Sequence, residues 1–479
     1  MPSIPQSLLL LYTLAQAAFA TNQTELNACL ALNALTKHSL NTAVYFVPYT
    51  TDSLHWVTSS TQASTCVYLP ASPEDLAAGV KLIGEQRVRF AISCSGHAMN
   101  PGFSSTPGIH ISMHRFQNVS ISTDRSYVDI GGGISWADVY SKLDGTGLSV
   151  VGGRVPGPGI GGFKITGGGG YSWKTNRYGL TGDTLILAKL VLPNGTLTTA
   201  SDTVNPDLFW AIRGGGNRFG VLYSLRLQAI PQSSVVYGGV KLLTGDEIAP
   251  LLNATHNFAN TNQDLHAQIL PTVNYIEGEP SALLIALYDD DPGDINPFAS
   301  FNASFNKQSF SSFVGSIPSL LQSGHRGSFN TVNFQSLSMP VLEQIKNQSR
   351  YWGQQMLAHS GSFVSLELEA FAPYAQFAKD AAWPHTTNSL PLNIYYSWDD
   401  AQQDDFWHSA LKETARVLAE TAKADGQELN GLNLYPNYAI AGTPAKLMYT
   451  EPNLIRLRQL QKVYDPNGVM LLTTFFDFE

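Results

Sequence analysis

A glycine-rich run between residues 150 and 170 constrains the fold of this chain more than any other stretch. It reads Val-Val-Gly-Gly-Arg-Val-Pro-Gly-Pro-Gly-Ile-Gly-Gly-Phe-Lys-Ile-Thr-Gly-Gly-Gly-Gly. Each glycine costs roughly 0.5–1 kcal/mol relative to alanine inside regular structure, because it has more backbone freedom to lose on folding. The usual compensation is a main chain that approaches a ligand more closely than a Cβ atom permits. We therefore predict a long loop pressed against a large planar ligand.

Part of this run fits the G-x-G-x-x-G pattern of dinucleotide-binding domains, with glycines at positions 157, 159 and 162. That fingerprint also requires a helix at its last glycine and an acidic residue about 20 positions further on. The chain instead continues into four consecutive glycines at 167–170, which do not start a helix. The sequence therefore excludes a Rossmann-type site.

The length of the chain predicts two domains, because 479 residues exceed what one ordinary hydrophobic core encloses. Apolar residues make up 43% of the sequence and charged residues 14%, which is typical of a compact, lightly charged globular protein. The formal net charge of −9 argues against a nucleic-acid partner, which would require a basic face. We expect a monomer.

The first 20 residues have the features of a secretory signal peptide. Their apolar stretch ends in Ala18-Phe-Ala20, an A-x-A cleavage pattern, and is too short to span a bilayer. The alternative is a buried first helix. Six N-x-S/T sequons agree with secretion, at Asn22, Asn118, Asn194, Asn253, Asn302 and Asn347. We expect a secreted, extracellular glycoprotein with no membrane partner.

Three cysteines follow the predicted signal peptide. In an oxidising compartment two of them should pair. Cys29 lies on an amphipathic segment and Cys66 opens an apolar strand, so we predict a disulfide between these two. Cys94, in a Ser/Gly loop, is then a small packing residue rather than a nucleophile.

Periodicity and turn signals predict a strand–helix–strand unit near the start, in which Ser72 caps a helix that opens with Pro73. Asn194-Gly195 predicts a hairpin between two apolar strands. The remaining elements that we expect are helices over 25–35, 136–143, 207–212, 404–424 and 453–464, and strands over 66–70, 89–93, 128–130, 185–192, 197–200, 221–229 and 281–288.

Four glycine-bearing turns, near residues 95, 132, 167 and 215, all fall in the first half of the chain. Turns at strand ends can hold an extended cofactor through backbone N–H groups. None of the four has the lysine of a G-x-x-x-x-G-K-[ST] phosphate loop.

Several motifs in this order resemble the berberine-bridge-enzyme-like oxidoreductases, a group of vanillyl-alcohol-oxidase-type FAD proteins. The first is Ser93-Cys-Ser-Gly-His97 followed by Pro101-Gly-Phe-Ser-Ser, similar to the family's R-S-G-G-H turn. The others are Gly159-Ile-Gly-Gly-Phe, Gly167-Gly-Gly-Gly-Tyr, Arg177-Tyr-Gly-Leu, Asp207-Leu-Phe-Trp-Ala-Ile-Arg-Gly-Gly-Gly, Tyr435-Pro-Asn437-Tyr and Tyr464-Asp-Pro-Asn. They cover both ends of the chain and match the middle weakly.

The resemblance implies an α+β fold in which both chain ends form a PCMH-type FAD-binding domain. It further implies a middle substrate domain with an antiparallel sheet backed by helices, in a secreted member of the fungal type. The boundaries that we predict are a signal peptide at 1–20, the FAD-binding domain at 21–232, the substrate domain at 233–431 and a returning segment at 432–479. The FAD-binding residues implied are Ser93, Cys94, Ser95, Gly96, His97, Gly102, Val155, Gly159, Gly161, Gly162, Thr166, Gly167, Gly168, Gly220, Val221 and Asn437.

By the same resemblance, His97 carries the flavin covalently through its 8α methyl group. Many relatives have a second link, from a cysteine at the position that Val155 occupies here, so we expect a single link. Pro158 stands where relatives have a Val, Leu or Ile that controls oxygen access to the flavin, which leaves oxidase and dehydrogenase open. Ser93 replaces the Arg or Lys that often opens the histidine turn.

Tyr435 matches the tyrosine of the family's Y-x-N motif, which implies a base that takes the proton of a substrate hydroxyl. A free tyrosine has a pKa of about 10, so such a base needs a site that lowers this value. Asn393 and Tyr395 alternate on one strand and should face the flavin together. Tyr171, Trp173, Trp383 and His385 are weaker candidates for the pocket wall.

His110 and His114 have the helical spacing of metal ligands, but their surroundings indicate a strand, and we predict no metal. No G-x-S-x-G elbow indicates serine hydrolysis. The favoured function is FAD-dependent oxidation of an alcohol carbon of a carbohydrate or a small secondary metabolite, with molecular oxygen as candidate acceptor. The alternative is a non-redox role, in which the flavin is a scaffold for cyclisation or ligand binding.

Overall fold

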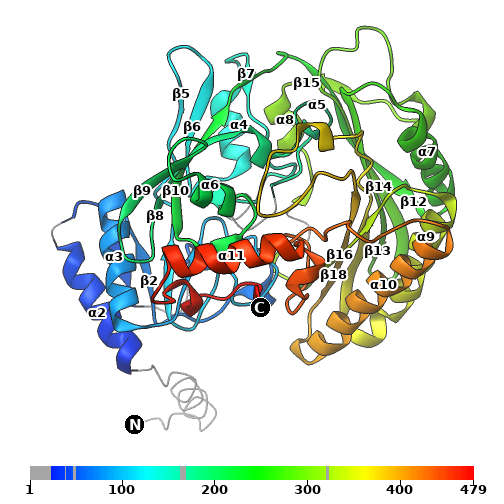
Figure 1. Cartoon of the computed structure of the whole chain (residues 1–479). Coiled ribbons are helices and arrows are strands. Elements are labelled where there is room, and N and C mark those ends of the chain that lie inside the picture. Colours follow the sequence, from blue (N-terminus) through cyan, green and yellow to red (C-terminus); the bar gives the residue numbers. More distant parts are fainter. Residues whose placement is uncertain (1–22, 38, 47–49, 162–168, 320–322) are drawn as a thin grey trace, which may run out of the picture.

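The computed structural model describes residues 23–37, 39–46, 50–161, 169–319 and 323–479. Within these ranges the first part of the chain builds two larger sheets and a two-stranded one, and the middle part builds one large sheet beside them (Figure 1). The predicted signal peptide and the sequon at Asn22 lie outside the described residues. None of the helices in these ranges is both apolar and long enough to cross a membrane.

The first sheet has the strand order β1-β2-β4-β3. Its elements are β1 (Ala43–Tyr45), β2 (Cys66–Leu69), β3 (Phe90–Ser93) and β4 (Ile109–Ser112), with helices α2 (Gln23–Thr36) and α3 (Pro73–Gln86). The strands β2 and β3 each pair in parallel with β4, which lies between the two strands of the predicted strand–helix–strand unit. The Ser72 hydroxyl accepts a hydrogen bond from the Asp75 N–H at 3.1 Å and caps α3 as predicted.

The predicted disulfide joins Cys29 of α2 to Cys66 of β2. Both cysteines are buried in the core beneath the first sheet. The third cysteine, Cys94, is free.

The second sheet is antiparallel and has the order β5-β6-β10-β8-β9. Its strands are β5 (Val119–Ile121), β6 (Tyr127–Gly131), β8 (Leu185–Val191), β9 (Leu197–Ser201) and β10 (Val221–Gln228), and a small pair is formed by β7 (Leu148–Ser149) and β11 (Ile230–Pro231). The accompanying helices are α4 (Trp136–Leu143), α5 (Thr175–Tyr178) and α6 (Pro206–Ala211). The hairpin predicted at Asn194-Gly195 connects β8 and β9, and Gly195 has the positive φ of 84° that favours glycine there.

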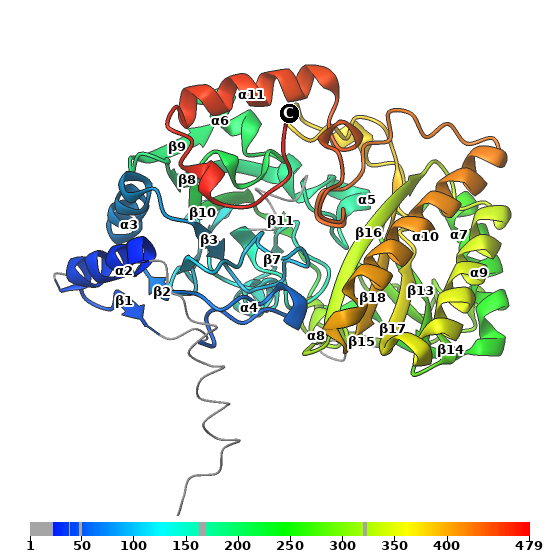
Figure 2. The ribbon, with the colours of Figure 1, turned by 90° about the horizontal axis from the view of Figure 1, so that it is seen from below.

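The large sheet has the order β15-β12-β14-β13-β17-β18-β16, and all its pairs are antiparallel. Its strands are β12 (Val236–Thr244), β13 (Ala267–Ile276), β14 (Glu279–Tyr288), β15 (Asn306–Gln308), β16 (Arg326–Phe334), β17 (Gly361–Glu367) and β18 (Leu390–Trp398). Helices α7 (Ile248–Thr261), α9 (Met339–Gln355) and α10 (Asp404–Ala424) cover one face (Figure 2). The short α8 (Phe310–Gly315) lies next to α4.

Strand alternation divides the large sheet into a helix-covered face and an open face. Along β13, Ile269, Val273 and Tyr275 pack in the core under the helices, whereas Leu270 and Thr272 point the other way. Both faces of this strand are buried, and its polar residues Gln268, Thr272 and Asn274 are buried with it. The open face of the sheet turns toward the first half of the chain.

The C-terminal segment returns to the first half of the chain. Its helix α11 (Glu451–Tyr464) packs on α6 (Figure 1). The Arg218 guanidinium donates hydrogen bonds to the carbonyl oxygens of Met470 at 3.0 Å and Phe475 at 3.2 Å. The antiparallel sheets and their covering helices confirm the predicted α+β class. The domain boundaries at 232 and 431 stay predictions.

Candidate active site

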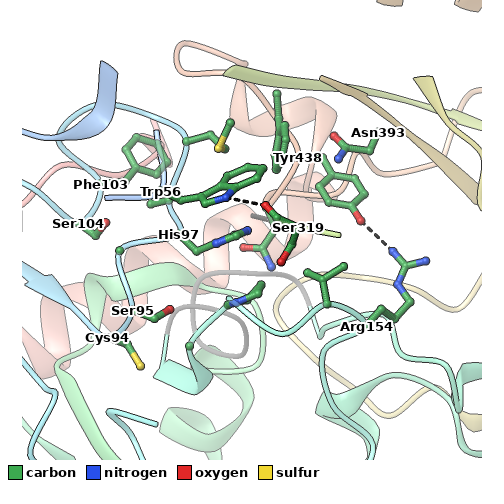
Figure 3. A pocket seen from close by; sticks show the side chains of 18 of the residues that line it. Trp56, Cys94, Ser95, His97, Phe103, Ser104, Arg154, Ser319, Asn393 and Tyr438 are labelled. Carbon is green, nitrogen blue, oxygen red and sulfur yellow. Dashed lines mark hydrogen bonds between the residues drawn. The ribbon is translucent and has the colours of Figure 1, made fainter. Parts of the chain in front are cut away.

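A cavity of about 300 Å³ lies between the open face of the large sheet and the strand ends of the first two sheets (Figure 3). Three parts of the chain line it. The glycine-bearing turns after β3 and β6 and before β10 form one wall, and the large sheet forms the opposite wall. The C-terminal segment adds residues 435–438 and Phe475.

The turn after β3 carries His97 into this cavity. Gly96 has a φ of +67°, and a Cβ atom there would lie 2.4 Å from the Leu54 carbonyl oxygen, so the turn requires glycine. Burial and the neighbouring His55 lower the pKa of His97 to about 4. The imidazole is therefore neutral at physiological pH and has a lone pair free for bond formation.

The described part of the glycine run packs directly on the His97 turn. A Cβ atom on Gly159 would lie 2.2 Å from Cys94 Sγ, and one on Gly157 would lie 3.2 Å from the His97 ring. The Pro158 carbonyl oxygen accepts a hydrogen bond from the Trp136 N–H at 3.1 Å, which fastens the loop to the first turn of α4. Here the main chain itself borders the cavity, because glycines have no side chain to separate it from a ligand. This is the arrangement predicted for a planar ligand.

The predicted cofactor-binding residues fall into three groups. Those that line the cavity are Cys94, Ser95, Gly96, His97, Val155, Gly159, Gly161, Gly220, Val221 and Asn437. Two do not line it: Ser93 is buried at the end of β3, and Gly102 packs against the side chain of Thr474. Four others lie outside the described residues: Gly162, Thr166, Gly167 and Gly168.

The wall formed by the large sheet contributes a carboxylate that the sequence analysis missed. Glu367, the last residue of β17, lines the cavity and accepts a hydrogen bond from Asn393 Nδ2 at 3.1 Å. Burial raises the pKa of Glu367 to about 7, against the opposing effect of the Asn393 hydrogen bond. Glu367 can therefore take up and release a proton near neutral pH.

A buried ion pair lies beside Glu367. Arg154, from the glycine run, makes a two-point contact with Glu369. Arg154 Nη2 also donates to Tyr438 Oη at 2.8 Å (Figure 3). This hydroxyl donates to Glu369 Oε1 at 3.1 Å. Glu369 thereby neutralises Arg154, which has little net charge left to hold Glu367 ionised.

Tyr435 lines the cavity and accepts a hydrogen bond from Asn437 Nδ2 at 3.0 Å. Burial raises the pKa of Tyr435, although Asn437 and Arg154 act in the opposite direction. A tyrosine that acts as a base needs a lowered pKa, whereas these surroundings raise the pKa of Tyr435. In the structure as described, Tyr435 is a neutral phenol that can donate a hydrogen bond.

Strand β18 has the alternation expected from the sequence. Asn393 and Tyr395 share the open face, while Leu392 and Ile394 pack under the helices. Only Asn393 lines the cavity. Tyr395 instead stacks on Trp56, with ring centroids 5.5 Å apart, and does not line the cavity.

The weaker aromatic candidates also separate. Tyr171 and Trp173 line the cavity, whereas Trp383 and His385 do not. His385 instead forms a buried pair with Asp183, with 2.8 Å between Nε2 and Oδ1. In the described ranges, no three His, Cys, Asp or Glu side chains are grouped as a metal site. His110 lies on strand β4 as expected.

The residues of the cavity wall that the sequence analysis did not single out include Trp56, Arg154 and Glu367. Glu367 and Glu369 alternate in the run Ser-Leu-Glu-Leu-Glu, which places two carboxylates on one face of an apolar strand and could have identified them. Arg154 interrupts the glycine run and carried a weaker signal. Trp56 belongs to an irregular segment without a motif, so nothing in the sequence indicated it.

The rest of the sheet wall is largely apolar. Leu270, Leu283, Ile285 and Phe329 point into the cavity from the sheet, and Ile317 adjoins them. Thr272 and Ser365 are the smaller polar residues on this wall. A ligand here meets hydrocarbon over most of its surface and a few polar groups beside Glu367.

Comparison with known proteins identifies this arrangement. Residues 64–201 match the FAD binding domain family. An uncharacterized FAD-linked oxidoreductase of Arthroderma benhamiae is 30% identical over 392 residues, which cover 77% of each chain. The protein belongs to the FAD-linked oxidoreductases. An FAD-dependent monooxygenase of Arthrobotrys oligospora is 27% identical over 444 residues, covering 90% of this chain and 85% of that protein.

Solved structures of FAD-linked oxidoreductases share the whole fold. A berberine-bridge-enzyme-like protein of Physcomitrella patens superposes with a TM-score of 0.76 at 17% identity, over 94% of this chain and 98% of that one. A chitooligosaccharide oxidase superposes with a TM-score of 0.71 at 19% identity, over 92% and 97%. The predicted berberine-bridge-enzyme-like, PCMH-type fold is thereby confirmed.

The residues present fit FAD. When bound, FAD supplies a ring system that accepts two electrons as a hydride. At Gly96, Gly157 and Gly159 an added Cβ atom would crowd neighbouring atoms and displace the main chain beside the cavity. The neutral His97 imidazole points into this cavity. Backbone groups of the turns at 94–97 and 159–161 would hold the cofactor, while Glu367 faces the cavity from the sheet.

Proposed function

We propose that this FAD-linked oxidoreductase oxidises a small, largely apolar alcohol and uses molecular oxygen as its electron acceptor. A carbon–hydrogen bond of the alcohol is broken as a hydride, the hydroxyl proton goes to the protein, and a carbonyl product is left. When bound, FAD would supply the acceptor of that hydride, and oxygen would be reduced to hydrogen peroxide. The observation that carries this proposal is the Glu367–Asn393 pair, which faces the same cavity as His97.

The composition of the wall favours a small metabolite over a carbohydrate. A sugar presents hydroxyl groups on every side, and each one that loses water without a new partner costs free energy. The sheet wall offers Leu270, Leu283, Ile285 and Phe329 over most of its area. Such a wall suits an aromatic or alicyclic substrate with a single hydroxyl group directed at Glu367.

We assign the proton acceptor to Glu367 rather than to Tyr435. A general base is most effective when its pKa lies near the working pH, and the pKa of Glu367 is about 7. The pKa of Tyr435 is raised instead. Tyr435 and Asn437 then serve as hydrogen-bonding groups that orient the cofactor or the substrate oxygen.

We further propose that FAD is attached covalently to His97 and to no cysteine. Val155 lines the cavity at the position of the second link in many relatives. Cys94 also lines the cavity, but burial raises the pKa of its thiol to about 11, so it is not a thiolate at physiological pH. Mass analysis of the peptide that contains His97 tests the attachment.

The residue at the predicted oxygen-access position is Pro158, which lines the cavity between Gly157 and Gly159. The ring of proline limits the backbone and leaves a fixed, compact side chain at this point of the wall. Reduced protein mixed rapidly with air-saturated buffer should return to the oxidised spectrum and produce peroxide in equal amount. A reduced spectrum that persists in air would show that another acceptor is used.

A substrate screen under anaerobic conditions tests the reaction. Vanillyl alcohol, cinnamyl alcohol and cellobiose are each added to the holoprotein, and loss of the flavin absorbance near 450 nm is followed. We expect reduction by an aromatic alcohol and none by the sugar. Binding without any reduction would support the non-redox alternative, and incorporation of labelled oxygen into the product would show oxygenation instead.

We also propose that the protein is secreted and glycosylated. The five sequon asparagines within the described residues are all exposed: Asn118, Asn194, Asn253, Asn302 and Asn347. The Cys29–Cys66 disulfide agrees with an oxidising compartment. Recovery from the culture medium and a lower mass after removal of N-linked glycans are the expected results.

A further inference from the structure

The segment around Trp56 covers the turn that carries His97. The Trp56 indole stacks on the His97 imidazole, with ring centroids 4.5 Å apart and 19° between the planes (Figure 3). Both side chains line the cavity. Trp56 thus forms the boundary of the cavity directly over the histidine to which the cofactor is proposed to attach.

Hydrogen bonds fix the position of Trp56 from three directions. Its N–H donates to the Gly96 carbonyl oxygen at 2.9 Å, so the segment is tied to the histidine turn itself. Its carbonyl oxygen accepts from the Gly324 N–H at 3.0 Å, and its indole Nε1 donates to the Ser319 carbonyl oxygen at 2.9 Å. The indole also stacks on Tyr395 of β18. An aromatic ring held in this way has little freedom to rotate.

The imidazole of His97 is confined by the glycine run as well. A Cβ atom on Gly157 would lie 3.2 Å from both Cε1 and Nδ1 of His97, so the loop backbone is close to the ring. Trp56 and Gly157 together restrict the rotation of the imidazole about its side-chain bonds. Confinement of this kind lowers the entropy lost when two groups are joined.

We propose that Trp56 is a positioning residue for the covalent attachment of FAD to His97. This inference rests on the proposed attachment. In that step an imidazole nitrogen forms a bond to the 8α carbon, while a C–H bond of the methyl group and the imidazole N–H bond are broken. The two protons and two electrons released are taken up by molecular oxygen as hydrogen peroxide. Trp56 holds the ring in the orientation in which its nitrogen meets that carbon.

Three variants of the full-length holoprotein test this role. Trp56→Ala removes the stacking ring, and Trp56→Phe keeps an aromatic face without the indole hydrogen bond. Phe406→Ala is the matched control, because Phe406 also stacks on an imidazole, that of His359, but lies outside the cavity. The readout is the fraction of flavin that stays with the protein after acid precipitation, with the mass of the His97 peptide.

We expect attachment in Trp56→Ala to be roughly tenfold slower, because misplacement of a reacting group by about 1 Å commonly has such effects. Fresh FAD added to the unattached protein gives the time course. Trp56→Phe should recover most of the rate, and Phe406→Ala should match the wild type.

Normal attachment in Trp56→Ala would overturn the proposal, and so would an equal loss in Phe406→Ala. If Trp56→Ala does not fold, Trp56→Leu replaces it as the variant without an aromatic ring. Slower attachment in Trp56→Leu that is recovered in Trp56→Phe supports the role, and a wild-type rate in Trp56→Leu contradicts it. A wild-type His97 peptide without added mass would instead refute the attachment itself. That result is distinct from a defect confined to the Trp56 variants.

Discussion

Glu367 and Asn393 lie directly opposite each other on strands β17 and β18, and Asn393 Nδ2 donates to Glu367 Oε2 at 3.1 Å. Cross-strand neighbours on one face of a sheet are held at a nearly constant separation. The amide therefore keeps the carboxyl group of Glu367 directed along the cavity wall. The pair places the proposed proton acceptor on a rigid element rather than on a loop.

Glu367→Gln should abolish most of the activity while the fold is retained. Loss of a general base typically costs about 10²- to 10⁴-fold in rate, and we expect an effect in this range. The measurement is the rate of flavin reduction by substrate without oxygen. Ser365→Ala, which changes a polar residue on the same wall, is the control and should keep near-normal rates. A Glu367→Gln rate within twofold of the wild type, taking about 0.4 kcal/mol as negligible, would exclude this base.

The same carboxyl group predicts a pH dependence. The flavin reduction rate should rise with pH through an apparent pKa of about 7, because only ionised Glu367 accepts a proton. The pKa of Glu367 is higher in the folded than in the unfolded chain, so the folded state binds the proton more tightly. Its contribution to the free energy of unfolding is therefore present at acid pH and is lost as pH rises through about 7. Glu367→Gln should remove both dependences.

Tyr435→Phe distinguishes the two candidate bases. With Glu367 as the acceptor, the variant loses only the hydrogen bonds of a neutral phenol, worth about 0.5–1.5 kcal/mol each. The reduction rate should then fall by about tenfold or less, and its dependence on Glu367 ionisation should persist. A loss as large as that of Glu367→Gln, with the pH dependence gone, would return the role of base to Tyr435.

The Arg154–Glu369 pair should be important for stability because it is buried. Arg154→Met leaves Glu369 without its cation, and breaking a buried pair in this way typically costs about 3–5 kcal/mol. Arg154→Met combined with Glu369→Gln should recover most of that loss, since neither charge remains. Denaturant unfolding of the holoproteins measures both. A double variant no more stable than the single one would contradict this account.

Gly159→Ala tests the close approach of the glycine run to the His97 turn. Its methyl group would lie 2.2 Å from Cys94 Sγ, so the loop has to move. Overpacking of this kind costs about 1–3 kcal/mol, and we expect a markedly lower flavin content per protein, measured from the visible and ultraviolet absorbance. Gly315→Ala in α8 is the control, because a Cβ atom there meets nothing within 4 Å. Equal flavin contents would refute the role of Gly159.

Local signals in the sequence were enough for many elements of the fold. Ser72 and Pro73 marked the start of α3, and helical spacing marked α4 and α10, whose bounds agree with the structure. These signals act between residues a few positions apart, where backbone geometry and capping decide the outcome. The histidine turn and the glycine run were evident for the same reason, because glycine is required wherever a Cβ atom does not fit.

Tertiary structure alone determined the contacts and the protonation states of the cavity wall. Arg154 meets Glu369 across 215 positions, and Trp56 meets Tyr395 across an even longer stretch, so no local pattern could pair them. A pKa depends on burial and on charges that folding brings near, and for that reason the sequence suggested Tyr435 as the base where we propose Glu367. Residue types and turn geometry follow from the local sequence, whereas protonation states and long-range contacts depend on tertiary packing.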